Sequence, residues 1–517
     1  MRRSILILGL AAALMGGCSM APDYKRPDLP VQNAWPQGTV SLGATRANGA
    51  TPAAELDWRD FLPDEAMREL VRVGLENNRD LRVAILNIEK SRAQYRIQRA
   101  DRLPTVNAEG GTTQQRLPHD LSSTGQAQTT REYYADLGVS SFELDIFGRV
   151  KSLSDEALET YLATEEARRS THISLVAELA SDYLTLVAER ERLAIVHDTV
   201  SSRSKSYDLT RHLFEAGQTT ELDLRQAEAS LETARAQEAA TRTAVAQAEN
   251  ALRLALGAPL PKDIVVPDTL DKVVEPKDVP PGLPSDLLER RPDILQAEHQ
   301  LKAANADIGA ARANFFPKIT ITGTFGTASH ELDGLFDANS QAWTFAPRAV
   351  LPIFDFGRNM ATLEVSKASR SIAVAQYEKS IQTAFREVSD ALAVRANLQE
   401  RMAAQEKAVA ADKRSLYLSE KRYSAGIDSF LPVLTAQRSL FASQLTFLSL
   451  RLERMNNLLT LYKTLGGGWT DKDMNDGLAG AQVAVETDAN AQPVADNTAS
   501  PSPNHASSGT PTPVDAH

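Results

Sequence analysis

The chain has 517 residues, of which 42% are apolar and 24% charged, and its 67 acidic and 56 basic residues give a formal net charge of −11. This balance disfavours a nucleic-acid-binding protein, which needs clustered positive charge, and the apolar fraction is sufficient for a buried core. The single cysteine excludes intrachain disulfides, and no run of about 18 uncharged apolar residues follows the first twenty, so membrane-spanning helices are not expected.

The first residues are typical of a targeting signal. Two arginines precede an apolar run of about twelve residues, which suits a signal peptide and is too short to span a membrane. Two glycines and Cys18 follow, and this arrangement resembles the lipobox of bacterial lipoproteins. The resemblance implies a signal peptide of residues 1–17, acylation of Cys18, for instance with palmitate, and sorting to the outer membrane because Ser19 follows. A cleaved secretory signal with an incidental cysteine is the simpler alternative.

The rest of the chain contains an internal repeat at an offset of about 209 residues, or about 213 further upstream. The matching pairs are Phe147-Gly148-Arg149 with Phe356-Gly357-Arg358, Phe214-Glu215-Ala216-Gly217 with Tyr423-Ser424-Ala425-Gly426, Leu256-Gly257 with Leu465-Gly466, Asp80 with Asp293, and Pro104 with Pro317. Two equivalent halves therefore replace the roughly three domains that length alone suggests. The predicted division is an N-terminal segment 18–63, a first repeat 64–257, a linker 258–284, a second repeat 285–469 and a disordered acidic tail 470–517.

Each half begins with a helical pattern, at residues 64–101 and 285–314, that stops before a proline. Two strands should follow, because apolar and polar residues then alternate with a period of two. The alternation is clear at residues 133–140, 319–325 and 343–349 and weakest after Pro104. Strands of about ten residues with one apolar and one polar face are typical of a membrane barrel. Polar connectors are expected near residues 118–130 and 328–340.

A proline-free helical pattern of about 65 residues follows each Phe-Gly-Arg, which corresponds to roughly 100 Å of helix. Such a helix must run in a coiled coil or a solenoid. The last helix supports this with a heptad seam: Leu431, Arg438, Leu445, Leu452, Leu459 and, three residues later in each heptad, Leu434, Phe441, Leu448, Met455, Tyr462. Heptads alone do not distinguish two-stranded packing from a ring of helices.

Two tight turns are predicted after the long helices. Gly217 and Gly426 suit the left-handed position that ends a helix. Thr219 or Thr220 in the first half, and Ser429 in the second, are the expected N-caps of the return helices. Each half should therefore form a long helical hairpin whose tip lies far from the strands.

Taken in order, these features resemble the outer-membrane efflux protein family, the TolC-like channels, and especially its lipoprotein branch. The resemblance covers about residues 18 to 470. Its marks are Cys18 followed by Pro22, Tyr24, Arg26-Pro27 and Trp35; Phe-Gly-Arg at both strand-to-helix junctions; Ala-Gly at both tips; Ala436-Gln437-Arg438-Ser439-Leu440; and Leu465-Gly466-Gly467-Gly468-Trp469.

The resemblance implies a mainly α subunit that contributes four strands to a trimeric twelve-stranded β-barrel in the outer membrane of a Gram-negative bacterium. Its long coiled-coil hairpins would form a periplasmic α-helical barrel. The trimer would be a passive duct, with a periplasmic adaptor protein and an inner-membrane pump of the resistance-nodulation-division type as partners. A covalent lipid on Cys18 is expected, and no other cofactor.

The same resemblance suggests functional residues. In the lipoprotein branch a leucine, an aspartate and an arginine narrow the periplasmic entrance, and these positions match Leu431, Thr435 and Arg438. Because a threonine replaces the aspartate, the entrance should lack a carboxylate ring. Arg438 would then need another partner, either Asp428 or a residue of the first hairpin. On the heptad alone, Arg438 is equally well a residue that sets the helix register. The tips implied to contact the adaptor are Ala216, Gly217, Ala425 and Gly426.

The sequence carries no catalytic motif: it has no His-Glu-x-x-His, no Gly-x-Ser-x-Gly and no phosphate-binding glycine loop, so no enzyme and no metal site is expected. The leading hypothesis is a trimeric duct for drugs or other small toxic molecules. Alternatives are a duct of the same architecture for metal ions or a secreted protein, a periplasmic coiled-coil lipoprotein without a pore, and a lipid-anchored enzyme.

Overall fold

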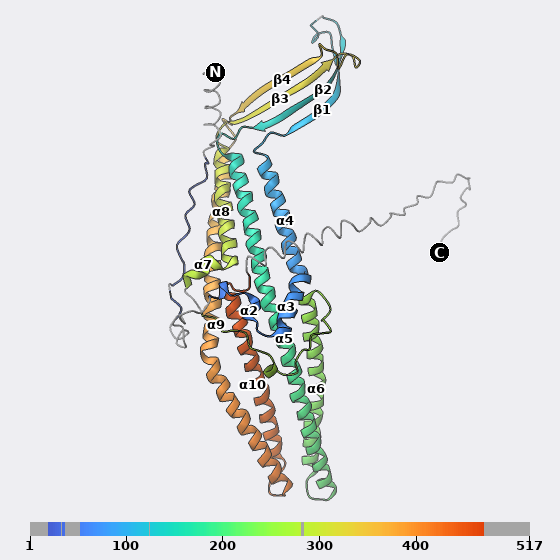
Figure 1. The fold of residues 1–517 in the computed structure, drawn as a ribbon, viewed down its shortest axis with the longest axis vertical. Helices are drawn as coiled ribbons and strands as arrows, with labels where there is room; N and C mark the ends of the chain where they lie inside the picture. The colour runs from blue at the N-terminus through green and yellow to red at the C-terminus, as the bar shows by residue number, and fades with distance from the viewer. Residues whose placement is uncertain (1–18, 33, 37–51, 124, 281–283, 470–517) are drawn as a thin grey trace, which may run out of the picture.

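The computed structural model describes residues 19–32, 34–36, 52–123, 125–280 and 284–469. The molecule is elongated, with a four-stranded sheet at one end and the tips of two helical hairpins at the other (Figure 1). The signal peptide, Cys18 and the tail from residue 470 lie outside the described residues.

Two helices of 67 residues dominate the fold. They are α5 (Arg149–Glu215) and α9 (Arg358–Ser424), and each returns in a shorter helix, α6 (Glu221–Leu256) or α10 (Leu431–Thr464). At 1.5 Å per residue each long helix extends roughly 100 Å, so the prediction of two long hairpins is confirmed. The other helices are η1 (Ala53–Glu55), α2 (Trp58–Phe61), α3 (Glu65–Asn77), α4 (Arg79–Ala100), η2 (Leu270–Lys272), η3 (Pro284–Asp286), α7 (Leu287–Arg290) and α8 (Pro292–Ala313).

The sheet is antiparallel, with the order β1-β2-β3-β4. Its strands are β1 (Val106–Leu117), β2 (Gln128–Glu143), β3 (Lys318–Ser329) and β4 (Gln341–Val350). The register aligns Leu137 with Phe325 and Phe325 with Trp343, so one face carries an apolar row. All three side chains are exposed, and they point to the same face because directly opposite residues of an antiparallel pair lie on one face of the sheet. The alternation therefore predicted the strands and their apolar face correctly.

The helices follow the same repeat as the sequence. Next to the sheet, α5 packs against α4 on one side and α8 on the other, and α8 packs against α9. Towards the tips, α5 packs against α6 and α10, and α10 packs against α9 (Figure 1). The first-half helices α4 and α5 thus correspond to α8 and α9 of the second half, in the same layer.

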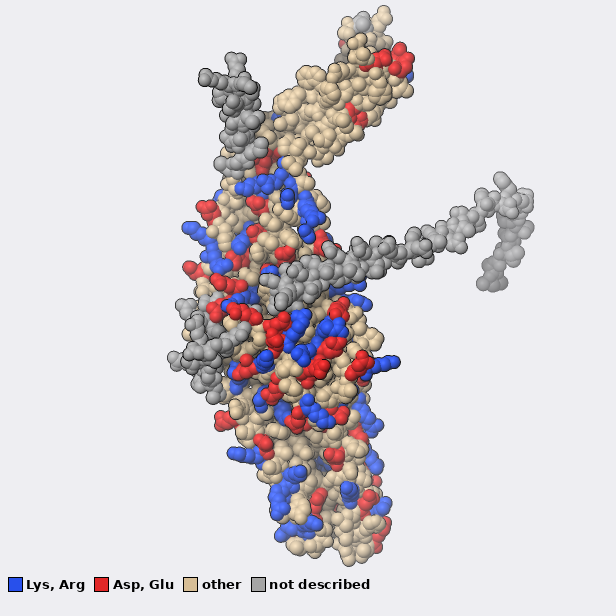
Figure 2. All heavy atoms as spheres, viewed as in Figure 1, with Lys and Arg blue, Asp and Glu red and all other residues tan. Residues whose placement is uncertain are grey.

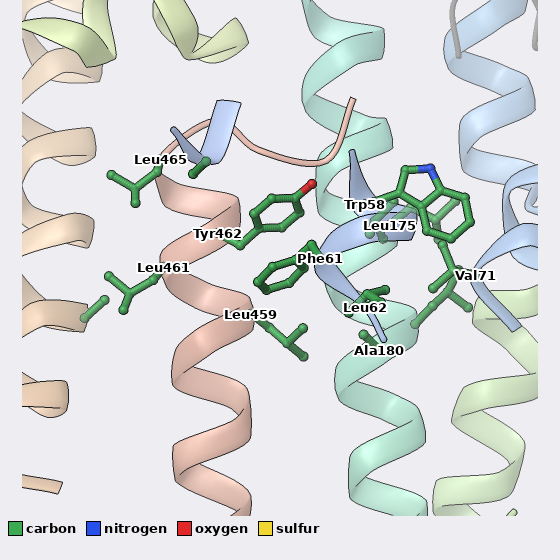
Figure 3. Close-up of a cluster of buried hydrophobic side chains, with 14 of the residues drawn as sticks. Trp58, Phe61, Leu62, Val71, Leu175, Ala180, Leu459, Leu461, Tyr462 and Leu465 are labelled. Carbon is green, nitrogen blue, oxygen red and sulfur yellow. The ribbon is translucent and has the colours of Figure 1, made fainter. Parts of the chain in front are cut away.

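The main hydrophobic core lies at mid-length, where the short helices cross the long ones (Figure 3). Phe61 of α2 stacks on Tyr462 of α10 with ring centroids 3.7 Å apart, and Trp58 and Leu62 lie beside them. Burial of such large side chains is worth about 1.5–3 kcal/mol each. The core therefore joins the segment before the first repeat to the end of the second.

The N-terminal arm, here residues 19–32 and 34–36, runs along α8 and α9. Arg26 donates hydrogen bonds to both carboxylate oxygens of Glu298, at 3.2 and 2.8 Å, and Trp35 stacks on Phe385 at 5.1 Å. Burial alone would raise the pKa of Glu298, but the Arg26 hydrogen bond and the Lys302 charge outweigh it and hold that pKa below its usual value. The arm is thus fixed by an ion pair between exposed Arg26 and buried Glu298 and by ring stacking.

Two predicted helices differ in the structure. The first, residues 64–101, is broken at Asn78 into α3 and α4, because the Asn78 side chain accepts from the Leu81 N–H as an N-cap and donates to the Ala255 carbonyl. The second, residues 285–314, becomes a regular long helix only at Pro292, after the short elements η3 and α7.

The heptad seam of α10 is only partly buried. Five of its ten members are buried: Leu434, Leu448, Met455, Leu459 and Tyr462. Near the tip, Leu431 and Arg438 are exposed instead. Among the residues that the structure describes, no helix combines the length and apolar composition needed to cross a bilayer.

Candidate functional site

The hairpin tips are a pair of nearly identical turns. In the first, the Ala216 N–H donates to the His212 carbonyl, and Gly217 follows with φ +70°. In the second, Ala425 and Gly426 repeat this arrangement, with Gly426 at φ +71°. A glycine adopts this left-handed conformation without the steric penalty of a Cβ. A Cβ added at either glycine would meet no atom within 4 Å, so the tips present open backbone.

The return helices begin differently. Thr220 caps α6 in a capping box with Asp223. The prediction that Ser429 caps the return helix is wrong. Helix α10 begins at Leu431, with buried Phe430 at the N-cap position and no side-chain cap. The aromatic ring is buried in the contact between the hairpins, so packing fixes this helix start in place of a hydrogen bond.

The predicted gate residues share one face of α10, because Leu431, Thr435 and Arg438 are spaced by four and three residues. All three are exposed, Leu431 by 58%. The Thr435 hydroxyl donates to the Leu431 carbonyl at 3.0 Å, so it is satisfied within the helix. We call these three residues the entrance face.

Asp428 is not the partner of Arg438. It accepts two hydrogen bonds from Arg422, at 2.6 and 2.9 Å, and these hydrogen bonds hold the pKa of Asp428 below its usual value. Asp428 thus closes the tip turn of its own hairpin. The charge of Arg438 acts instead on Arg203 of the first hairpin, whose pKa is lowered first by burial and then by that charge.

Three side-chain contacts tie the two hairpins together near the tips. The hydroxyls of Thr210 and Tyr423 lie 3.1 Å apart, and Gln437 donates to the Ser206 hydroxyl at 2.9 Å. The third contact is a small apolar cluster that contains Ala227, Tyr423, Phe430, Val433 and Leu434. The buried side of α10 thus faces the first hairpin, and the three exposed residues of the entrance face lie outside the apolar cluster.

Sequence reasoning missed the residues that link the hairpins. Thr210 and Tyr423 are 213 positions apart, and neither lies in a motif. The one available signal was the repeat itself, because Tyr423 corresponds to Phe214 and so carries a hydroxyl in only one copy. Helix periodicity does not show which residues meet between helices.

The other end of the molecule suits a membrane. On the face shown in Figure 2, charged side chains cover the helical body, whereas the sheet carries few of them. The residues that follow Cys18 lie close to this end, because Arg312 near the end of α8 donates to the Met20 carbonyl at 3.0 Å. Within the described ranges, no three His, Cys, Asp or Glu side chains come together as a metal site would require.

Comparisons with known proteins agree with this architecture. The sequence model of the outer membrane efflux protein family matches residues 70–258 and 283–467. The toluene efflux pump outer membrane protein TtgC of Pseudomonas putida is 47% identical over 487 residues, 94% of this chain and 99% of the relative. Outer membrane protein OprJ of Pseudomonas aeruginosa is 45% identical over 467 residues, 89% of this chain and 95% of OprJ.

Solved structures are similar over the same length. The open state of the Neisseria gonorrhoeae MtrE outer membrane channel is 38% identical, with a TM-score of 0.78 over 87% of this chain and 98% of MtrE. A membrane protein of Pseudomonas aeruginosa is 44% identical, with a TM-score of 0.80 over 87% of this chain and all of that one. The chain has the fold of the TolC-like channels and is a protein of the outer membrane, and it belongs to the outer membrane efflux protein family.

Proposed function

We propose that three copies of this chain form the outer-membrane duct of a tripartite efflux pump. The duct is passive and carries drugs, solvents or other small toxic molecules outward. A periplasmic adaptor docks at the tips formed by Ala216, Gly217, Ala425 and Gly426, and an inner-membrane pump of the resistance-nodulation-division type supplies the energy. The names of the relatives support the substrate class, since two of those 47% identical are an antibiotic and a toluene efflux protein.

The observation that carries this proposal is the pair of open sheet edges. Among the described residues, β1 and β4 each pair with one strand only. In lipid an open edge leaves backbone N–H and C=O groups unpaired, at several kcal/mol each, so the sheet must close through other copies. Three copies supply twelve strands, an even number within the range of outer-membrane barrels.

The internal repeat indicates how one copy meets the next. Within the chain, Phe147 at the first strand-to-helix junction stacks on Phe316, just after α8, with ring centroids 4.8 Å apart. The corresponding residue in the second half is Phe356, which is 89% exposed. The counterpart of Phe316 is Leu103, just after α4, and it is 71% exposed. Phe356 of one copy should therefore pack against Leu103 of the next.

Further support comes from exposed apolar side chains on α4 and α9, the two outer helices of the helix layer next to the sheet. Exposed apolar side chains occur on the two helices that would meet there: Val83, Leu86 and Ile97 on α4, and Met360, Val365 and Ile372 on α9. Apolar side chains exposed on both of these helices would be covered where one copy meets the next. A periplasmic coiled-coil lipoprotein without a pore is disfavoured, because such a protein has no use for an amphipathic sheet. Acylation at Cys18 would anchor each copy beside the sheet.

Reconstitution of the purified full-length protein into planar lipid bilayers tests the duct. We expect trimers by native mass spectrometry and stepwise ion currents. The matched control is Gly326→Val, because a Cβ at Gly326 meets the Ala135 carbonyl across the β2–β3 pair. This variant should lose the current. Monomers without current from the unaltered chain would overturn the proposal, and transport of metal ions but not of organic cations in cells would favour the metal-ion alternative.

A further inference from the structure

An open cavity of about 590 Å³ lies where the sheet meets the helices α5, α8 and α9 (Figure 1). Strand ends from β2, β3 and β4 form one part of its lining, and the first residues of α5 and α9 form another. The lining includes the apolar side chains Ile146, Phe316 and Val350 and several charged side chains. A cavity of this size is within the range of sites that hold a drug-sized molecule.

One arginine of this cavity is unpaired because the two copies of the repeat differ. In the first copy, Arg149 donates hydrogen bonds to both carboxylate oxygens of Glu143, at 2.7 and 2.6 Å. The corresponding arginine of the second copy is Arg358, but the residue that corresponds to Glu143 is Pro352, whose side chain has no acceptor. Within the described part of the chain, the exposed Arg358 side chain makes neither an ion pair nor a hydrogen bond.

A second arginine of the cavity, Arg348, is also exposed and has no partner among the described residues. The register places Arg348 opposite Thr320 and Thr320 opposite Glu143, so these three residues share one face of the sheet. Phe325 and Trp343 are an odd number of positions from Thr320 and Arg348, so the apolar row is on the other face. When the sheet closes with its apolar face towards lipid, Arg348 faces the lumen of the barrel.

The carboxylates that line the cavity have other partners. Glu143 is shared between Arg149 and Lys318, whose Nζ lies 2.9 Å from the carboxylate. Asp145 and Asp355 accept hydrogen bonds from backbone N–H groups at the starts of α5 and α9. The cavity therefore presents two exposed guanidinium groups without an acceptor, next to an apolar wall.

We propose that this cavity binds an amphiphilic organic anion, whose carboxylate or sulfonate is attracted by Arg348 and Arg358. Its apolar body lies against the wall formed by Ile146, Phe316 and Val350. A guanidinium group is weakly hydrated and always charged, and it donates to a carboxylate in a matching planar geometry. The placement of the site in the lumen rests on the proposed duct, where it would favour acidic solutes over neutral ones of equal size. Binding itself does not require the duct.

Calorimetric titration of the full-length protein in nanodiscs of uncharged lipid tests the site. The probe is naphthalenesulfonate, and naphthalenesulfonamide is the neutral probe of nearly the same shape. Titration of empty nanodiscs corrects for partition into the lipid. We expect the sulfonate to bind with about tenfold higher affinity than the sulfonamide, the factor that corresponds to one hydrogen bond to a charged group.

Variants locate the bound anion. The double variant Arg348→Gln, Arg358→Gln should lose this tenfold preference, and each single variant should lose part of it. The double variant Arg348→Lys, Arg358→Lys keeps both charges and should retain most of the preference, which would exclude misfolding as the cause. The matched control is Arg116→Gln, an exposed arginine near the opposite end of the sheet, which should bind as the unaltered protein does.

Three outcomes would overturn the proposal. Equal affinity for the two probes, or no binding of either, would mean that the arginines do not form an anion site. Unchanged preference in the double glutamine variant would place the anion elsewhere on the protein. Equal loss in Arg116→Gln would indicate a general effect of surface charge. None of these results affects the duct, because stepwise currents in the bilayer experiment do not require a bound organic anion.

Discussion

The hydroxyl groups of Thr210 and Tyr423 lie 3.1 Å apart in a buried contact between the two hairpins. Thr210 is in the last turns of α5 and Tyr423 in the last turn of α9, so the contact joins the halves just above their tips. The Tyr423 ring also packs against Phe430 at 5.3 Å. If the entrance opens by separation of the hairpins, as we propose, opening must break this contact.

Tyr423→Phe should loosen the entrance without removing the ring. The Thr210 hydroxyl keeps its bond to the Ser206 carbonyl, so the loss is one hydrogen bond, worth about 0.5–1.5 kcal/mol. We expect more frequent or larger open steps in single-channel recordings. Tyr417→Phe, which alters an exposed tyrosine on the same helix, should behave as the unaltered protein. Identical recordings for Tyr423→Phe would show that the contact does not restrain the entrance.

Arg438→Ala should raise single-channel conductance, because it removes the longest side chain of the entrance face. A suitable control is Arg414→Ala, an exposed arginine on α9 outside this face. Unchanged conductance in Arg438→Ala would remove this residue from the gate and leave it a role in helix register.

The proposed seam between copies can be tested by cysteine cross-linking. We expect the double variant Leu103→Cys, Phe356→Cys to form covalent dimers and trimers under oxidation, visible on a denaturing gel without reductant. The two positions should be close enough, because their counterparts Phe316 and Phe147 are in ring contact. Leu103→Cys with Phe336→Cys, at an exposed site in the β3–β4 connector, is the control. Trimers on a native gel without any cross-link would refute this seam but not the trimer.

Glu156 should make stability depend on pH. Burial, and next the charge of Asp307, raise its pKa to about 7 from 4.5. The folded state therefore binds this proton more tightly than the unfolded state. Its stabilising contribution is complete below about pH 4.5 and is lost as the pH rises through 7. At pH 8 the free energy of unfolding of Glu156→Gln should therefore exceed that of the unaltered protein by about 1–2 kcal/mol. At pH 4.5 the two values should be nearly equal.

Melting followed by far-UV circular dichroism at the two pH values measures this difference. Glu400→Gln, at an exposed position of α9, should show no comparable pH-dependent change. If Glu156→Gln lowered the melting temperature at pH 8, the carboxylate would be stabilising and the predicted sign would be wrong.

Truncation after Trp469 should leave assembly intact. The buried stretch Leu465–Gly468 and the contact of Arg169 over the Trp469 ring, 4.4 Å from its centroid, already complete the described fold. Truncation after Thr464 is the contrast, because it removes these contacts and should reduce the amount of trimer on a native gel. Loss of trimers after truncation at Trp469 would give the tail 470–517 a structural role.

Local patterns were sufficient for much of the fold. The length of α5 and α9, the glycine turns at Gly217 and Gly426, and the alternation in β3 and β4 depend on residues a few positions apart, and each was predicted. The failures were also local. Asn78 was not recognised as a cap inside a helical pattern, and Ser429 was expected to cap a helix that packing of Phe430 begins.

The sequence by itself determined the two equivalent halves and the long hairpins, because periodicity and the repeat are properties of the chain. Only the tertiary structure decided which charges and polar groups meet: Asp428 binds Arg422, Thr210 meets Tyr423, and Gln437 donates to the Ser206 hydroxyl. These contacts join residues on different helices or across a turn. Their partners depend on how the helices are rotated and packed, and no spacing along one helix encodes that.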